Sequence, residues 1–127
     1  MKYSNAHMSH LIDTLAPFLE RTDLIGYAAA RNTRKLSDSC AEYLATRDRL
    51  IAELGEQELD NNGNPTGRAS ISVNSPAFEE FVKRIESIAN IEHDVELMTI
   101  PYDEAIGKIS GADLLKIDWM FEGGEFN

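Results

Sequence analysis

The longest predicted helix covers residues 24–54, which read LIGYAAARNTRKLSDSCAEYLATRDRLIAEL. This run contains no proline, is interrupted only by Gly26, and is followed directly by Gly55, a natural C-terminal stop. Residues spaced three and four apart form a heptad-like seam in two halves, with one extra residue between them: Ile25, Ala29, Asn32 and Leu36, then Cys40, Tyr43, Arg47, Leu50 and Leu54. A helix of this length spans about 45 Å, so it must pack on other helices or on a second copy of the chain.

Shorter helices are predicted on both sides of this run. Apolar stripes with helical spacing cover about residues 6–16, 75–90 and 110–121. The residues expected to cap the helices are Ser4 or Asn5, Thr22 or Asp23, Ser75 before Pro76, and Ser110. We expect the long helix to pack on the 75–90 helix and to bury Leu36, Tyr43, Leu50, Phe78, Phe81 and Ile85.

The β content is expected to be small. Asn62-Gly63 predicts a type I′ turn that closes a short hairpin, within a mobile loop over residues 56–69. Ile71 and Val73 alternate with serines and predict a short strand. The alternation over 91–97 predicts another strand, with one acidic face.

These patterns predict a single domain over residues 1–127. Its fold is mostly α with a minor antiparallel β element (α+β), with a long helix packed on shorter helices and a short hairpin or two to three short strands. Gly123-Gly124 ends the last helix, and the tail over 123–127 is expected to fray.

The chain is acidic, with 22 Asp and Glu residues against 12 Lys and Arg residues and a net charge of −10. Such a field repels nucleic-acid phosphates and anionic membrane surfaces, so neither is an expected partner. A basic protein surface is favoured instead, for example the nucleic-acid groove of another protein. The acidic charge also has the plain role of keeping a small protein in solution.

Cysteine use and the N-terminal sequence indicate the cytoplasm. Cys40 is the one cysteine, so no disulfide forms within the chain, and its place on an apolar stripe favours a buried, inert thiol. The opening MKYSNAHMSH has no apolar signal-peptide core. No stretch approaches 18 consecutive apolar residues, so no membrane span is expected.

Several segments resemble, in the same order, a family of small proteins of unknown function encoded by tailed phages and prophages. These segments are KYSNAHMSHLIDTL, YAAARNTRKL, YLATRDRLIAELGE, DNNGNP, SPAFEEFVKRIESIANIEHDVEL and ISGADLLKIDWMFE. The resemblance covers nearly the whole chain and implies phage origin and expression in the cytoplasm of a bacterial host. It carries over no functional residue.

No set of residues in the sequence predicts a metal, a cofactor or catalysis. His7 and His10 share a helix face, but Asp13 lies off that face and no third ligand is supplied. Asp60, Asn62 and Asn64 begin like a calcium loop, but Pro65 and Ile71 stand where glycine and glutamate are needed. There is no Ser-His-Asp set, phosphate loop or zinc motif, so we expect no cofactor and no enzyme.

The densest basic cluster lies within about one turn of the long helix. It consists of Arg31, Arg34 and Lys35, and with an aromatic side chain such as Tyr27 or Tyr43 beside it in a pocket it would suit a nucleotide-like anion. The alternative is that these residues simply pair with acidic neighbours such as Asp38.

The acidic strand face is the candidate partner surface. Its residues are Glu92, Asp94, Glu96, Asp103 and Glu104. Met98 and Ile100 fall on the same parity and are candidate apolar anchors, unless a bulge turns them into the core.

Three functions remain open at this point. The first is a phage accessory protein that binds its partner stoichiometrically through the acidic surface and inhibits a host defence factor. The second is a small-molecule binder that sequesters a nucleotide signal, and the third is a phage structural or assembly protein. The long seam, with polar Asn32 and Arg47 setting its register, predicts a homo-oligomer, most simply a dimer.

Overall fold

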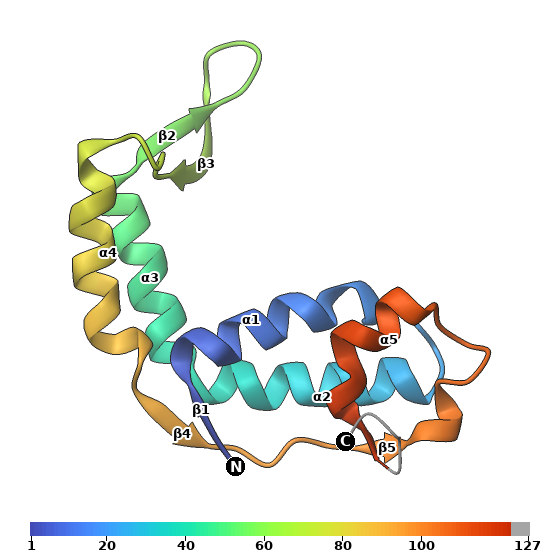
Figure 1. The fold of residues 1–127 in the computed structure, drawn as a ribbon. Helices are drawn as coiled ribbons and strands as arrows, with labels where there is room; N and C mark the ends of the chain where they lie inside the picture. The colour runs from blue at the N-terminus through green and yellow to red at the C-terminus, as the bar shows by residue number, and fades with distance from the viewer. Residues whose placement is uncertain (123–127) are drawn as a thin grey trace. The chain divides into compact units, whose positions relative to one another are not determined.

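The chain is mostly helical, with three short pairs of strands. The structure, a computed structural model, describes residues 1–122. Its helices are α1 (Asn5–Leu15), α2 (Leu24–Ser39), α3 (Ala41–Leu54), α4 (Pro76–Ala89) and α5 (Gly111–Ile117), with 3-10 turns η1 (Ala16–Phe18), η2 (Tyr102–Glu104) and η3 (Asp118–Met120). Its strands are β1 (Lys2–Ser4), β2 (Glu56–Leu59), β3 (Pro65–Ser70), β4 (Glu92–Asp94), β5 (Ile100–Pro101) and β6 (Phe121–Glu122). The predicted mostly α fold with a minor β element is confirmed (Figure 1).

These elements form two compact units. Unit 1 consists of residues 1–40 and 92–127, described as far as Glu122, and unit 2 consists of residues 41–91. Unit 2 is therefore inserted in the sequence of unit 1. The expected fraying of 123–127 lies outside the described residues. Over residues 1–122, no helix has the length and apolar character needed to cross a bilayer.

The predicted helix starts are confirmed at four caps. Each capping side chain accepts a hydrogen bond from a backbone N–H of the first turn and so satisfies one of its free donors. The bonds are His7 N to Ser4 Oγ (3.1 Å), Gly26 N to Asp23 Oδ1 (3.2 Å), Ala77 N to Ser75 Oγ (3.2 Å) and Asp113 N to Ser110 Oγ (3.1 Å).

The predicted single helix over 24–54 is wrong at Cys40, where α2 ends and α3 begins. Cys40 has φ −113° and ψ 24°, although its N–H still donates to the Leu36 carbonyl at 3.0 Å. The residues before it, Ser37, Asp38 and Ser39, favour helix ends because their side chains compete for backbone hydrogen bonds. The extra residue in the heptad seam lies at the same break, between Leu36 and Cys40.

The core of unit 1 lies where α1 packs along α2 and the later segments close over them. Its buried apolar side chains are Met8, Leu11, Leu15, Phe18, Ile25, Ala28, Ala29, Leu36, Cys40, Val95, Ile100, Ala105, Ile117, Met120 and Phe121. Gly26 belongs to this packing, because a Cβ there would lie 2.0 Å from the Arg21 carbonyl oxygen. The first half of the seam is thus buried inside unit 1.

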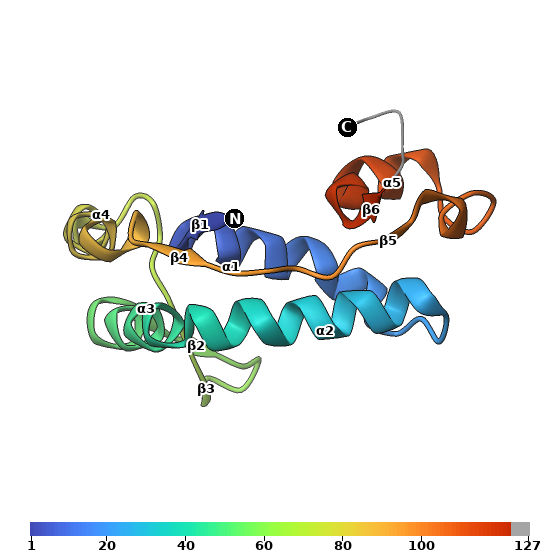
Figure 2. The same ribbon diagram turned by 90° about the horizontal axis from the view of Figure 1, so that it is seen from below.

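Two short strand pairs connect parts of unit 1 that lie far apart in the sequence. β1 and β4 are antiparallel, with Lys2 opposite Asp94 and Ser4 opposite Glu92. β5 and β6 are parallel, with Ile100 opposite Phe121, an addition to the antiparallel pairs that the sequence predicts. The strand expected over 91–97 is shortened to β4. Figures 1 and 2 show the chain from β4 to β5 as an extended segment that runs beside α2.

A buried asparagine holds this extended segment. Asn32 is fully buried on α2. Its Nδ2 donates to the Met98 carbonyl at 2.9 Å, and its Oδ1 accepts from the Met98 N–H at 2.6 Å. One amide thus satisfies both backbone groups of Met98. The predicted role of Asn32 in setting the register of a dimer is wrong, because its side chain is committed to the same chain.

In unit 2, α3 packs on α4, and β2 pairs with β3 as an antiparallel hairpin. The predicted hairpin is confirmed but its type I′ turn is wrong, because Gly63 has φ +81° while no non-glycine residue, Asn62 included, has a positive φ among residues 1–122. Asp60 Oδ1 accepts the N–H groups of Asn62 and Asn64, at 2.8 and 2.9 Å, and closes the loop. The strand expected at 71–73 is absent from the described elements because β3 ends at Ser70.

The apolar residues of unit 2 are less buried than predicted. Leu50 is buried, whereas Tyr43, Phe78, Phe81 and Ile85 are half-buried. Leu36, expected beside them, belongs to the core of unit 1. The helix pair is confirmed for α3 and α4, but its interface holds a small core.

The substitution Asn32→Ala tests the hold on Met98. It removes two hydrogen bonds and leaves the Met98 N–H and carbonyl without partners, so the free energy of unfolding should fall by roughly 2–4 kcal/mol. Urea unfolding measures this loss. Thr33→Ala is the matched control, because Thr33 Oγ1 is buried with no hydrogen-bond partner in the described residues. Equal losses in the two variants would contradict the assigned role of Asn32.

Candidate functional site

The five acidic residues predicted to form the partner surface fall into two groups. Glu92 and Asp94 lie on β4 and Glu96 follows them in the extended segment, whereas Asp103 and Glu104 lie in η2 beyond β5. Figure 1 shows β4 and β5 at opposite ends of that segment. The structure therefore brings the first three together, and we call them the acidic strip. It places Asp103 and Glu104 elsewhere in unit 1.

Several of these carboxylates have partners. The N-terminal ammonium contacts Asp94 Oδ1 at 2.9 Å, and this hydrogen bond lowers the pKa of Asp94. Lys108 Nζ contacts Glu104 Oε2 at 2.8 Å. Glu92 and Glu96 are exposed, and neither carboxylate has an ion pair with another residue of the 1–122 range. Glu92 and Glu96 are therefore the two carboxylates of the acidic strip that are available to form ion pairs with a partner.

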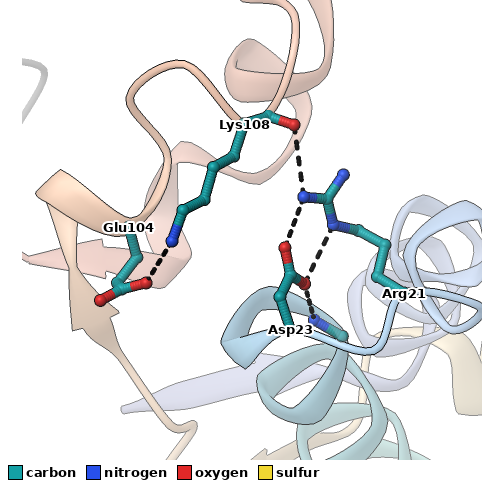
Figure 3. Close-up of polar contacts among 5 residues, drawn as sticks. Arg21, Asp23, Glu104 and Lys108 are labelled. Atoms are coloured by element: carbon teal, nitrogen blue, oxygen red, sulfur yellow. Dashed lines mark hydrogen bonds and ion pairs between the residues drawn. The ribbon is translucent and has the colours of Figure 1, made fainter.

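The loop beside η2 is fixed by a second polar network, drawn in Figure 3. The Arg21 guanidinium makes two hydrogen bonds to the Asp23 carboxylate and reaches the Lys108 carbonyl at 3.3 Å. Asp23 also caps α2. The hydrogen bond from Arg21 lowers the pKa of Asp23, and the N–H of Gly26 acts in the same direction. This network is structural, since its groups are satisfied by one another.

An open cavity of about 620 Å³ lies beside the acidic strip. Its lining is mostly apolar and aromatic, and it comes from β1, α1, the extended segment and η3: Met1, Tyr3, His7, Leu11, Val95, Glu96, Leu97, Thr99 and Trp119. We call it the Trp119 pocket. Apolar walls with a few polar groups at the rim are typical of sites that bind an apolar side chain or a small molecule.

Sequence reasoning missed this pocket and chose other apolar anchors. Ile100 is buried and pairs with Phe121 in β5–β6, so its prediction as an exposed anchor is wrong. Met98 is half-buried and held by Asn32. Trp119, the one tryptophan of the chain, was the available signal, but it lies more than twenty residues from the strip and only the tertiary fold joins them.

The basic cluster is brought together in part. Tyr27, Arg31 and Arg34 follow one another at spacings of four and three on α2, and with Ala30 they line a depression of about 410 Å³, the Tyr27 pocket. Tyr27 is 58% exposed. Neither arginine has an ion pair within the described part of the chain. Lys35 lies outside this pocket, because its Nζ donates to the Glu96 carbonyl at 2.9 Å.

The structure does not assemble the metal candidates into a site, although His7 lines the Trp119 pocket. The ring of His7 meets Tyr3 edge to face, with centroids 5.4 Å apart, and His10 and Asp13 are exposed. Asp60 is engaged by the N–H groups of its own loop. Across residues 1–122 no three His, Cys, Asp or Glu side chains gather closely enough to hold a metal ion.

No family model, curated protein or solved structure matches the chain.

The pH dependence of stability tests the Arg21–Asp23 network. The folded protein holds the pKa of Asp23 below its ordinary value of 3.8, so the unfolded chain takes up that proton at a higher pH. The stabilisation is therefore present above about pH 4 and is lost as the pH falls through the folded-state pKa.

The variant Asp23→Asn keeps a capping oxygen but removes the charge. Urea midpoints measured from pH 6 down to pH 2.5 should fall less steeply for Asp23→Asn than for the unaltered protein. Asp103→Asn is the control and should follow the unaltered protein, because Asp103 is exposed with no ion pair in residues 1–122. Parallel curves for all three proteins would rule out this contribution.

Proposed function

We propose that the protein acts by stoichiometric binding of a basic partner protein through the acidic strip and the Trp119 pocket. One observation carries this proposal: the exposed Glu96, which has no ion pair in residues 1–122, lines an apolar cavity of about 620 Å³. A free negative charge and an apolar cavity are thus adjacent on the surface of unit 1, as a partner with a basic and an apolar side chain would need.

The two features divide the work of binding. Charges at the rim of an interface mainly speed association and select the partner, whereas a buried apolar or aromatic anchor supplies most of the affinity. Glu92 and Glu96 are the rim charges, within a chain of net charge −10. The Trp119 pocket is the site for the partner's apolar anchor, in place of the anchors expected from the sequence. No chemical step is needed for this function.

The resemblance to phage and prophage proteins supports a biological setting for this binding. In that setting the protein is a phage-encoded accessory factor in the bacterial cytoplasm, and its partner is a basic, nucleic-acid-binding defence protein that it inhibits. Self-association belongs to the same proposal, and its support is now limited to the half-buried apolar side chains of α3 and α4.

The Tyr27 pocket favours a second candidate, the binding of a nucleotide-like anion. Two guanidinium groups with no ion pair in residues 1–122 lie beside an exposed phenol ring, which suits a phosphate attached to an aromatic base. Its walls come from a single helix, α2, which leaves the ligand largely in solvent. The Trp119 pocket, built from several elements, is the stronger site.

Charge reversal tests the proposed function. Proteins captured from a bacterial lysate by the unaltered chain should be lost with Glu92→Lys plus Glu96→Lys, and association with the main captured protein should slow by about tenfold at low salt. Asp103→Lys, at the other end of the extended segment, is the matched control and should retain the same proteins. The proposal would be contradicted if capture survived the double reversal but disappeared with Arg31→Ala plus Arg34→Ala. The binding site would then be the Tyr27 pocket.

A further inference from the structure

We propose that the partner binds as an added β-strand along residues 96–99, with an apolar side chain in the Trp119 pocket. The inference rests on the proposed function and specifies the partner's binding segment. That segment is an extended peptide in which an apolar anchor lies between lysine or arginine residues.

The backbone of the extended segment is satisfied on one side. Both groups of Met98 bond to Asn32, and the Glu96 carbonyl accepts from Lys35, so this side faces α2. In extended chain, the N–H and C=O of neighbouring residues point in opposite directions. The groups of Leu97 therefore point away from α2.

The opposite side of the segment is only partly covered. β1 pairs with β4, and the Val95 N–H donates to the Met1 carbonyl at 3.0 Å, which continues the pairing to Val95. Beyond that point, the N–H and C=O of Leu97 have no hydrogen-bond partner among residues 1–122. An unpaired donor and acceptor on extended chain form the template onto which a peptide strand adds.

The pocket borders this free edge and determines what the added strand carries. Val95, Leu97 and Thr99 line the cavity together with Tyr3 and Trp119. Because side chains of a strand alternate between its faces, every second side chain of the added peptide is directed to the same face. An apolar residue there fills the pocket, and basic residues beside it meet Glu96 and Glu92.

A synthetic peptide tests the inference with the full chain. The probe has alternating lysine and valine residues with a central phenylalanine, and it contains no tryptophan. Trp119 is the one tryptophan of the protein, so its fluorescence reports occupancy of the pocket. We expect saturable binding with a blue shift of Trp119 emission, because the phenylalanine displaces water from the pocket.

Backbone changes separate strand addition from simple charge attraction. Leu97→Pro removes the N–H at the free edge, whereas Leu97→Ala keeps the N–H and removes only the side chain that lines the pocket. Leu97→Pro should therefore bind about tenfold more weakly than Leu97→Ala. N-methylation of the peptide on alternate residues requires no change to the protein. One alternate set should abolish binding and the other should leave it intact, because an added strand uses one of its two edges.

The outcomes distinguish this inference from the proposed function. No peptide binding, equal effects of the two N-methyl sets, or equal affinities of Leu97→Pro and Leu97→Ala would each overturn strand addition. If Glu92→Lys plus Glu96→Lys still weakens capture of the lysate partner in that case, the proposed function stands without it. If binding depends on the backbone changes and is unaffected by the charge reversal, strand addition holds and the charge-based function fails.

Discussion

The arrangement of unit 1 depends on one buried amide. Asn32 on α2 bonds to both backbone groups of Met98, a residue 66 positions later in the chain. Inside a protein an unsatisfied N–H or carbonyl is costly, so an amide that matches both is stabilising only in one relative position of the two segments. That position sets the course of the whole segment from β4 to β5. The acidic strip, the Trp119 pocket and the free backbone edge all follow from it.

Local patterns predicted most of the helices. Ser4, Asp23, Ser75 and Ser110 were visible as caps because capping depends on a few neighbouring residues. The break at Cys40 has two signals in the sequence, the extra residue in the seam and the run Ser37, Asp38 and Ser39 before it. Continuous helix was expected there because no glycine or proline interrupts residues 27–54.

The candidate sites were predictable only where neighbours in sequence make them. Helical spacing correctly grouped Tyr27, Arg31 and Arg34. It also grouped Lys35 with them, but a carbonyl 61 residues away holds that side chain. The role of Asn32 was likewise hidden, since a polar residue on a seam looks the same whether its partner is a second chain or a distant loop.

Unit 2 has little core of its own. Leu50 is the one apolar side chain of residues 41–91 that is buried, and it keeps 5% of its surface exposed. Small units bury too little apolar surface to offset the entropy of ordering the chain. The α3–α4 hairpin is therefore expected to open at lower cost than unit 1, and hydrogen exchange should be faster there.

The insertion of unit 2 within unit 1 affects how the protein forms on the ribosome. α1 and α2 are made before unit 2, but Ile100, Ile117 and Phe121, which complete their core, are made only after all of unit 2. At roughly 5–20 residues per second, this delay lasts several seconds. During it, the α3–α4 hairpin can form from local contacts, while the apolar faces of α1 and α2 stay exposed to the cell's chaperones. The helices made before unit 2 thus acquire their final packing only after unit 2 has been made.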